Sequence, residues 1–224
     1  MSFTILPFSD ESPGGPTVRG AVHRPAAPSG DGLLLTHGAN FDIDNPLLVS
    51  MAVAFAEGGV TVLRCNLPSR QSRTQQQRRP RPNPVLDRAG LHRAVRCFRQ
   101  TVSGRMFIGG QSYGGRLATM IAADEPEGID GLLVLGYPLQ TEEKAREART
   151  RHFTRLQIRA LFVHGSKDQM APPQLLREAI TAIPVETRLV EIEGAGHSLG
   201  SANPKEELKV DVAAVTYGAF REFF

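Results

Sequence analysis

The chain has 224 residues, of which 41% are hydrophobic and 22% charged, and this suits one compact domain whose core needs no covalent staples. Only two cysteines occur, Cys65 and Cys97, and their spacing argues against a disulfide framework and against a CxxC-type zinc site. The net charge of +3 is uneven, because residues 67–105 hold ten arginines and a single acid, Asp87, which makes this segment +9 and the remainder −6.

The first residues lack the basic start, the long apolar run and the cleavage site of a secretory signal. No later segment approaches the length of a membrane span. We therefore expect a soluble, cytoplasmic protein with two reduced thiols and no membrane partner.

The first third of the chain predicts four strands and one helix. Residues 3–7 and 18–24 flank a turn-rich segment and are read as strands that can pair antiparallel. Residues 32–36 (GLLLT) are wholly apolar up to the final threonine, as in a buried central strand. A helix is predicted at residues 45–57, where asparagine is followed by proline, and residues 60–65 form the next strand.

An arginine-rich stretch follows this fourth strand. Residues 68–84 combine arginine, glutamine and proline without an apolar side chain, and they predict a long mobile loop. Beyond it, apolar residues recur at steps of three and four between Leu91 and Val102, which predicts an amphipathic helix.

The second half continues the alternation of strands and helices. Strands are predicted at residues 105–108, 131–135, 160–164 and 187–192, and helices at 116–123, 142–155 and 172–183. A last helix is predicted to begin at Asn203, because Asn203, Pro204 and Glu206 form a capping-box pattern. About eight strands and six helices in this order indicate a single α/β domain over residues 1–224, with a mostly parallel sheet and helices on both faces.

Gly110, Ser112 and Gly114 form a G-x-S-x-G pattern between a predicted strand and a small-residue helix. In a nucleophile elbow, this pattern lifts a serine hydroxyl above the sheet, and glycines flank it because the turn leaves no room for a Cβ. We predict that Ser112 is a nucleophile, and the alternative is a merely tight structural turn.

A serine hydroxyl needs a base within hydrogen-bonding reach. Of the six histidines, His197 is best placed, because it lies in a glycine-containing loop after the last predicted strand. His37 and His164 also end strands, but each precedes a glycine and is read as organising its turn through hydrogen bonds.

The acid of such a triad orients the imidazole and stands between nucleophile and histidine in chain order. Asp168 meets this order and lies just beyond a strand, while Glu142 and Glu143 are the alternative acids. For the oxyanion, we expect the N–H of Tyr113 and that of Ala39, with Asn40 as the alternative to Ala39.

The motifs LLLTHGA, GGQSYGG, LFVHGSKD and GAGHS, in this order, resemble those of the α/β-hydrolase superfamily. Within it, the chain is similar to the compact, uncapped branch that includes dienelactone-hydrolase-like and testis-expressed hydrolase-like proteins. The resemblance implies the α/β-hydrolase fold without a large cap domain, and Ser112, Asp168 and His197 as the catalytic positions. Dienelactone hydrolases use a cysteine nucleophile, so Ser112 argues against that particular activity.

Together these patterns predict a serine hydrolase that cleaves an ester or thioester of a small acyl substrate through an acyl-enzyme intermediate. No metal or organic cofactor is expected, because the sequence has no zinc cluster, phosphate-cradling loop or dinucleotide fingerprint. Arg70, Arg73 and Arg78 of the arginine-rich loop are candidates for binding a substrate anion, and the alternative, which makes fewer demands, is a solvated loop. The alternative function is a non-catalytic interaction protein whose arginine-rich loop binds an acidic partner or, less favoured, a nucleic acid.

Overall fold

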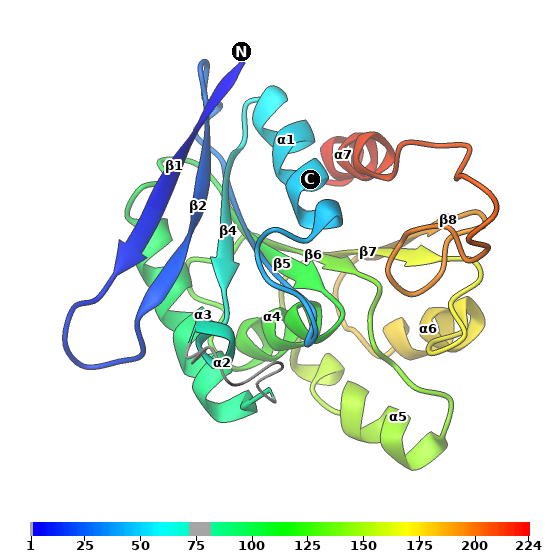
Figure 1. Cartoon of the computed structure of the whole chain (residues 1–224). Coiled ribbons are helices and arrows are strands. Elements are labelled where there is room, and N and C mark those ends of the chain that lie inside the picture. The colour runs from blue at the N-terminus through cyan, green and yellow to red at the C-terminus, as the bar shows by residue number, and fades with distance from the viewer. Residues whose placement is uncertain (1, 72–81) are drawn as a thin grey trace, which may run out of the picture.

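The structure, a computed structural model, describes residues 2–71 and 82–224 and contains one eight-stranded sheet (Figure 1). Its strands are β1 (Phe3–Asp10), β2 (Val18–Pro25), β3 (Gly32–Thr36), β4 (Thr61–Asn66), β5 (Met106–Gln111), β6 (Gly131–Leu135), β7 (Ala160–Gly165) and β8 (Thr187–Ile192). The spatial order is β1-β2-β4-β3-β5-β6-β7-β8, in which β2 pairs antiparallel with both β1 and β4, and every other pairing is parallel. The mostly parallel α/β sheet predicted from the sequence is thus confirmed.

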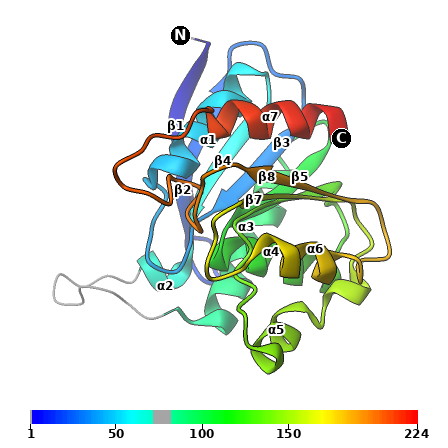
Figure 2. The same cartoon turned by 90° about the vertical axis from the view of Figure 1, so that its right-hand side faces the viewer.

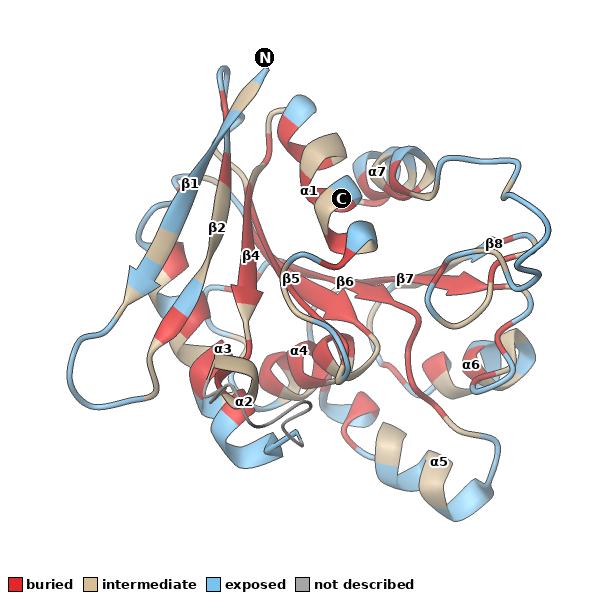
Figure 3. Ribbon diagram, viewed as in Figure 1, coloured by how far each residue is buried: buried red, intermediate tan, exposed pale blue. Residues whose placement is uncertain are grey.

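Helices cover both faces of this sheet. They are α1 (Pro46–Glu57), α2 (Pro68–Gln71), α3 (Pro84–Arg99), α4 (Tyr113–Asp124), α5 (Glu143–Thr150), the 3₁₀ turn η1 (Phe153–Arg155), α6 (Pro173–Ile180) and α7 (Val212–Phe223). Helices α1 and α7 lie on one face, whereas α3, α4 and α6 lie on the other (Figure 1). Each face has its own apolar core, and β3, β5, β6 and β7 are buried along their whole length between the two (Figure 3). None of the helices in the described part of the chain is long and apolar enough to cross a bilayer.

Two of the helices begin at an Asn-Pro pair. The side chain of Asn45 accepts a hydrogen bond from Leu47 N, and that of Asn83 accepts one from Leu86 N, while the following proline takes the first helical position in each. Helix α3 therefore starts seven residues before Leu91, where the apolar period becomes evident. The prediction of a loop over residues 68–84 is wrong at both ends, since α2 and the start of α3 are helical, and Arg73 and Arg78 lie outside the described residues.

The predicted last helix is displaced. Asn203 does cap a single turn, accepting from Lys205 N, but the turn does not propagate, and α7 begins at Val212 after its own N-cap, Asp211 (Figure 2). The residues after Asn203 are mostly exposed, so this segment has no apolar face to bury, and an isolated turn of helix is unstable without such packing. The predicted helix at 142–155 likewise ends at Thr150 and gives way to η1.

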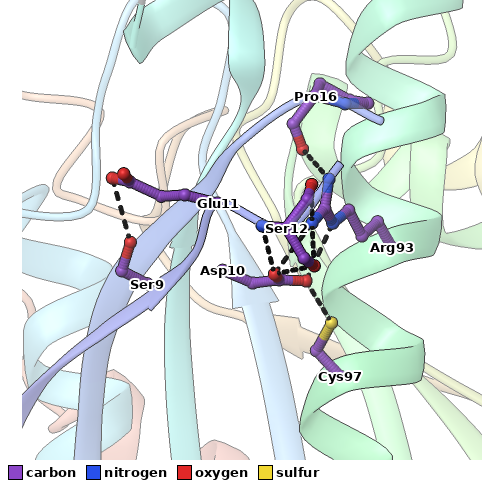
Figure 4. Close-up of polar contacts among 7 residues, drawn as sticks. All are labelled: Ser9, Asp10, Glu11, Ser12, Pro16, Arg93 and Cys97. Atoms are coloured by element: carbon purple, nitrogen blue, oxygen red, sulfur yellow. Dashed lines mark hydrogen bonds and ion pairs between the residues drawn. The ribbon is translucent and has the colours of Figure 1, made fainter. Parts of the chain in front are cut away.

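The β1–β2 hairpin is fastened to α3 by a polar cluster (Figure 4). Two nitrogens of Arg93 each lie 2.8 Å from an oxygen of Asp10, and Arg93 also donates to the carbonyl oxygens of Ser12 and Pro16. The thiol of Cys97 lies 2.7 Å from the same carboxylate. The Arg93 guanidinium holds the pKa of Asp10 far below its usual range, so this cluster stays ion-paired at neutral pH.

Candidate active site

Ser112 is the single residue between the end of β5 and the start of α4. Its φ of 50° and ψ of −113° are a backbone conformation that non-glycine residues rarely adopt. Its N–H donates to Leu135 O of β6 at 2.8 Å, which ties the turn to the carboxyl end of the sheet. A strained residue held by its surroundings in this way is a frequent feature of functional sites.

The two glycines that flank Ser112 are required by the backbone of β3. A Cβ added to Gly114 would lie 2.6 Å from His37 O, and one added to Gly110 would collide with Thr36 O. The parallel pairing of β3 with β5, which aligns Thr36 with Gly110, brings these carbonyls against the turn. Glycine at both positions lets the loop after β3 approach Ser112 closely.

His197 lies in the loop between β8 and α7 and contacts Ser112. Its Nε2 lies 2.9 Å from Ser112 Oγ, and the ring is held in a tight loop closed by Gly196 N to Gly200 O and Ala202 N to Gly194 O, both at 2.9 Å. This loop is long enough to fold back because β8 is followed by an irregular segment before α7. The imidazole is partly exposed, with 24% of its side-chain surface accessible, so a substrate can approach the Ser112–His197 pair.

Asp168 completes the chain of hydrogen bonds. Its Oδ2 lies 2.7 Å from His197 Nδ1, and its Oδ1 accepts from Met170 N at 2.9 Å and Ala171 N at 3.0 Å. Burial alone would raise the pKa of the Asp168 carboxyl, but the hydrogen bond and charge of His197, together with the Ala171 N–H, hold that pKa below its ordinary value. An ionised Asp168 fixes the proton of His197 on Nδ1 and leaves Nε2 free to accept from Ser112.

The loops of Asp168 and His197 are joined by their backbones. Ser166 N donates to Ile192 O at 3.0 Å, and Lys167 N donates to Ala195 O at 2.9 Å. Both contacts continue the parallel pairing of β7 with β8, which ends at Gly165 and Ile192. The pairing of β7 with β8 thus sets the position of Asp168 relative to His197.

His164, the last residue but one of β7, also contacts Asp168. The fully buried ring places Nε2 2.6 Å from Ala171 O and 3.2 Å from Asp168 Oδ2. Because a carbonyl oxygen only accepts, Nε2 carries the proton, and burial lowers the pKa of His164 so that the ring is neutral. From the sequence, His164 was expected to organise its turn. In the structure it also contacts the acid, Asp168.

The two groups expected to bind an oxyanion lie directly after Ser112 and in the loop that follows β3. Tyr113 is the first residue of α4, where a main-chain N–H has no partner within the helix. Ala39 is half-buried in the loop that leaves β3, next to Gly38, whose carbonyl accepts from Phe41 N. The side chain of Asn40 is exposed, and its carbonyl accepts from Arg70 Nη2 at 3.1 Å, which places Arg70 against this loop.

Asp87 ties three segments of the site together. Its wholly buried carboxylate accepts from the main chain and hydroxyl of Ser69 at 2.8 Å, from Asn83 N at 3.2 Å and from Tyr113 Oη at 3.0 Å. Both ends of the arginine-rich stretch are therefore anchored beside the residue that follows Ser112. The sequence holds a signal for this role, because Asp87 is the single acid among ten arginines.

The remaining candidates lie elsewhere or serve the fold. Glu142 caps α5 by accepting from Lys144 N and Ala145 N, and Glu143 is exposed on the same helix. Gln111, which sequence reasoning missed, accepts from Asn45 Nδ2 and so links the Ser112 turn to the start of α1. Among the described residues, no group of three or more His, Cys, Asp or Glu side chains is arranged to hold a metal ion.

Residues 30–222 match a family described as an alpha/beta hydrolase domain. Solved structures with the same arrangement include a dienelactone hydrolase from Anabaena variabilis, at 18% identity and a TM-score of 0.75 over 100% of this chain and 98% of that one. An α/β serine hydrolase without lid from Xanthomonas campestris is 17% identical, with a TM-score of 0.74 over 98% of this chain and 95% of that one. A thioesterase domain from the curacin biosynthetic pathway is 15% identical, with a TM-score of 0.69 over 97% of this chain and 99% of that one. At these identities the three likenesses establish a shared fold.

Proposed function

Because this chain belongs to the alpha/beta hydrolase domain family, we propose that it is a serine hydrolase that cleaves an ester or thioester of a small acyl substrate. One observation carries the proposal. Ser112 Oγ, His197 and Asp168 form a continuous chain of hydrogen bonds of 2.9 Å and 2.7 Å at a strained strand-to-helix turn. This is the arrangement that activates a serine hydroxyl in hydrolases of unrelated folds.

In the first half of the reaction, Ser112 Oγ attacks the acyl carbonyl while His197 Nε2 takes the hydroxyl proton. The carbonyl electrons move onto oxygen, and this oxyanion is stabilised by the N–H groups of Tyr113 and Ala39. When the tetrahedral intermediate collapses, the bond to the leaving group breaks, and His197 returns its proton to the departing alcohol or thiol. Asp168 holds the imidazole in the required tautomer and stabilises its positive charge.

In the second half, water replaces the leaving group. His197 takes a proton from the water as its oxygen attacks the acyl-enzyme, and the second intermediate expels Ser112 Oγ, which recovers the proton. The products are a carboxylic acid and the free enzyme. This sequence needs no electron donor or acceptor.

The segment after β6 is too short to form a large cap domain over the proposed site. Residues 136–159, where a cap domain would stand, form only α5 and η1, and this leaves the sheet edge open. Two large apolar side chains are exposed in the loops of the site, Phe41 at 41% and Met170 at 46%. We propose that they contact the apolar part of the acyl group, and that the enzyme acts in the cytoplasm, where its free thiols Cys65 and Cys97 stay reduced.

A fluorophosphonate probe tests the proposal, because it forms a covalent adduct with an activated serine. We expect the wild-type protein to be labelled at Ser112 and to hydrolyse 4-nitrophenyl esters or acyl thioesters. S112A should lose labelling and at least about 10³-fold in kcat while remaining folded. S50A is the matched control, since Ser50 is exposed on α1, and it should behave as wild type.

The result that contradicts the proposal is a folded wild-type protein that neither reacts with the probe nor turns over any ester or thioester. In that case salt-sensitive binding of an acidic partner would favour the interaction protein.

A further inference from the structure

Two arginines lie side by side where α4 meets α5. Arg116 stands in the first turn of α4, and its N–H donates to Ser112 O at 2.9 Å. Its Nη2 lies 3.3 Å from Ala148 O, in the last turn of α5, directly before Arg149. The backbone of Arg149 is held in turn by Tyr137 Oη, which donates to its carbonyl at 2.6 Å. Figures 1 and 2 show α4 and α5 on the same face of the sheet.

Among residues 2–71 and 82–224, no carboxylate pairs with either guanidinium group. Within the described chain, Arg149 makes no side-chain hydrogen bond or ion pair, and Arg116 Nε is buried without an acceptor. Burial and the neighbouring charge of Arg116 lower the pKa of Arg149, so the two groups are close enough to repel. Two titratable neighbours, Tyr137 and His152, are uncharged near pH 7, because burial raises the pKa of Tyr137, and burial and Arg116 lower the pKa of His152 to about 4.

This unbalanced pair differs from two other partly buried arginines of the fold. Arg88 and Arg93 face an aspartate at 2.6 Å and 2.8 Å, respectively. Partly buried charge is costly unless it is compensated. An arginine pair with free N–H donors and no carboxylate has the chemistry of a site for an external anion.

We propose that Arg116 and Arg149 bind a carboxylate or phosphate group carried by the substrate, which makes the substrate an anionic ester or thioester. The inference rests on the proposed hydrolase function. Position supports it, because Arg116 follows Ser112 by four residues, a rise of about 6 Å, and side chains of a helix lean toward its N-terminus. An acyl chain of a few carbons, ending in the anion, would span the distance to Ser112.

Paired substrates test this assignment. The 4-nitrophenyl monoesters of succinate, glutarate and adipate carry a terminal carboxylate, and the butyrate, valerate and hexanoate esters are their neutral counterparts. We expect R149Q to lower kcat/KM for the preferred anionic ester by about tenfold or more, and to leave the neutral esters within about twofold. R149K, which keeps the charge but loses the planar fork, should fall between. R151Q is the control, since Arg151 is exposed two residues further on.

A binding measurement separates this inference from the hydrolase proposal. In S112A, which cannot turn over substrate, succinate or inorganic phosphate should raise Tm, and the additional change R149Q should abolish the shift. If the wild type hydrolyses no ester but the Arg149-dependent shift persists, the anion site stands and the proposed function fails. If neutral esters are hydrolysed as well as anionic ones, with no effect of R149Q and no shift in Tm, the anion site is overturned.

Discussion

At the scale of single residues, the acid of the site is held by more donors than its role as a partner of His197 requires. The Asp168 carboxylate accepts from Met170 N and Ala171 N and lies close to His164 Nε2. The same Nε2 donates a hydrogen bond to Ala171 O at 2.6 Å. Acid, turn and histidine are thereby linked in a closed ring of polar contacts. This ring fixes which oxygen of Asp168 faces His197.

Removing the proton donor of His164 should loosen that ring. We expect H164F to lower kcat by about 10- to 100-fold with KM little changed, because small displacements of a catalytic group are costly. H164Q places an amide N–H near the position of Nε2 and should restore most of the loss.

The readouts are steady-state kinetics and the rate of fluorophosphonate labelling, compared at equal folded fraction. Equal labelling rates for H164F and wild type would show that His164 supports only the fold.

At the scale of elements, the dipeptide Asn-Pro starts a helix at two positions and only a turn at a third. Asn-Pro precedes α1 and α3 and caps both, yet at Asn203 and Pro204 the same pair starts only a turn. The difference lies in the residues beyond the pair, since α1 and α3 bury apolar faces against the sheet, whereas the segment after Asn203 is mostly exposed. Capping stabilises a helix that packing already favours.

The two competing caps of the last helix can be compared directly. D211A removes the acceptor for Ala213 N and Ala214 N, and it should lower the free energy of unfolding by about 1 kcal/mol. N203A removes only a turn in an exposed segment and should stay within about 0.5 kcal/mol of wild type.

Urea denaturation at neutral pH measures both variants. A larger loss for N203A than for D211A would place the start of α7 at Asn203 after all.

At the scale of the whole molecule, the parallel sheet brings the residues of the site together. Strands β3, β5, β7 and β8 end at one edge, and the loops after them carry Ala39, Ser112, Asp168 and His197. Besides the two apolar cores, the fold encloses buried histidines. His23 and His152 are both buried, and burial lowers the pKa of each to about 4.

Because the pKa of each of these histidines is lowered in the folded state, we predict that the protein loses stability in mild acid. In the unfolded chain a histidine takes up a proton below about pH 6.5, while the folded ring resists until about pH 4, so the unfolded state binds more protons in this window. The free energy of unfolding should be level above pH 6.5 and fall below it, by on the order of 2 kcal/mol per histidine at pH 5.

Urea titrations at pH 7 and pH 5 measure the effect. H152Q, which keeps a donor for Thr119 Oγ1, should weaken the dependence, and H92Q, at a half-exposed contact with Glu125, is the control. Equal stability at both pH values would contradict the assignment of neutral buried rings.

The sequence by itself was sufficient for the fold class and for the succession of strands along the chain, because buried parallel strands are continuous apolar runs and the glycines around Ser112 mark a turn without room for a Cβ. It also pointed to Ser112, Asp168 and His197, whose catalytic roles stay a prediction. Chain order and strand ends made that selection possible, since the ends of parallel strands share one edge.

Only the tertiary structure decided the rest. Four features depend on which segments pack together: the start of α7, the second contact of Asp168 with His164, the joining of three segments by Asp87, and the uncompensated pair of Arg116 and Arg149. Local sequence encodes the propensity of an element and the chemistry of a side chain. Whether a cap propagates, or a charge finds its partner, is set by neighbours that are distant in the chain.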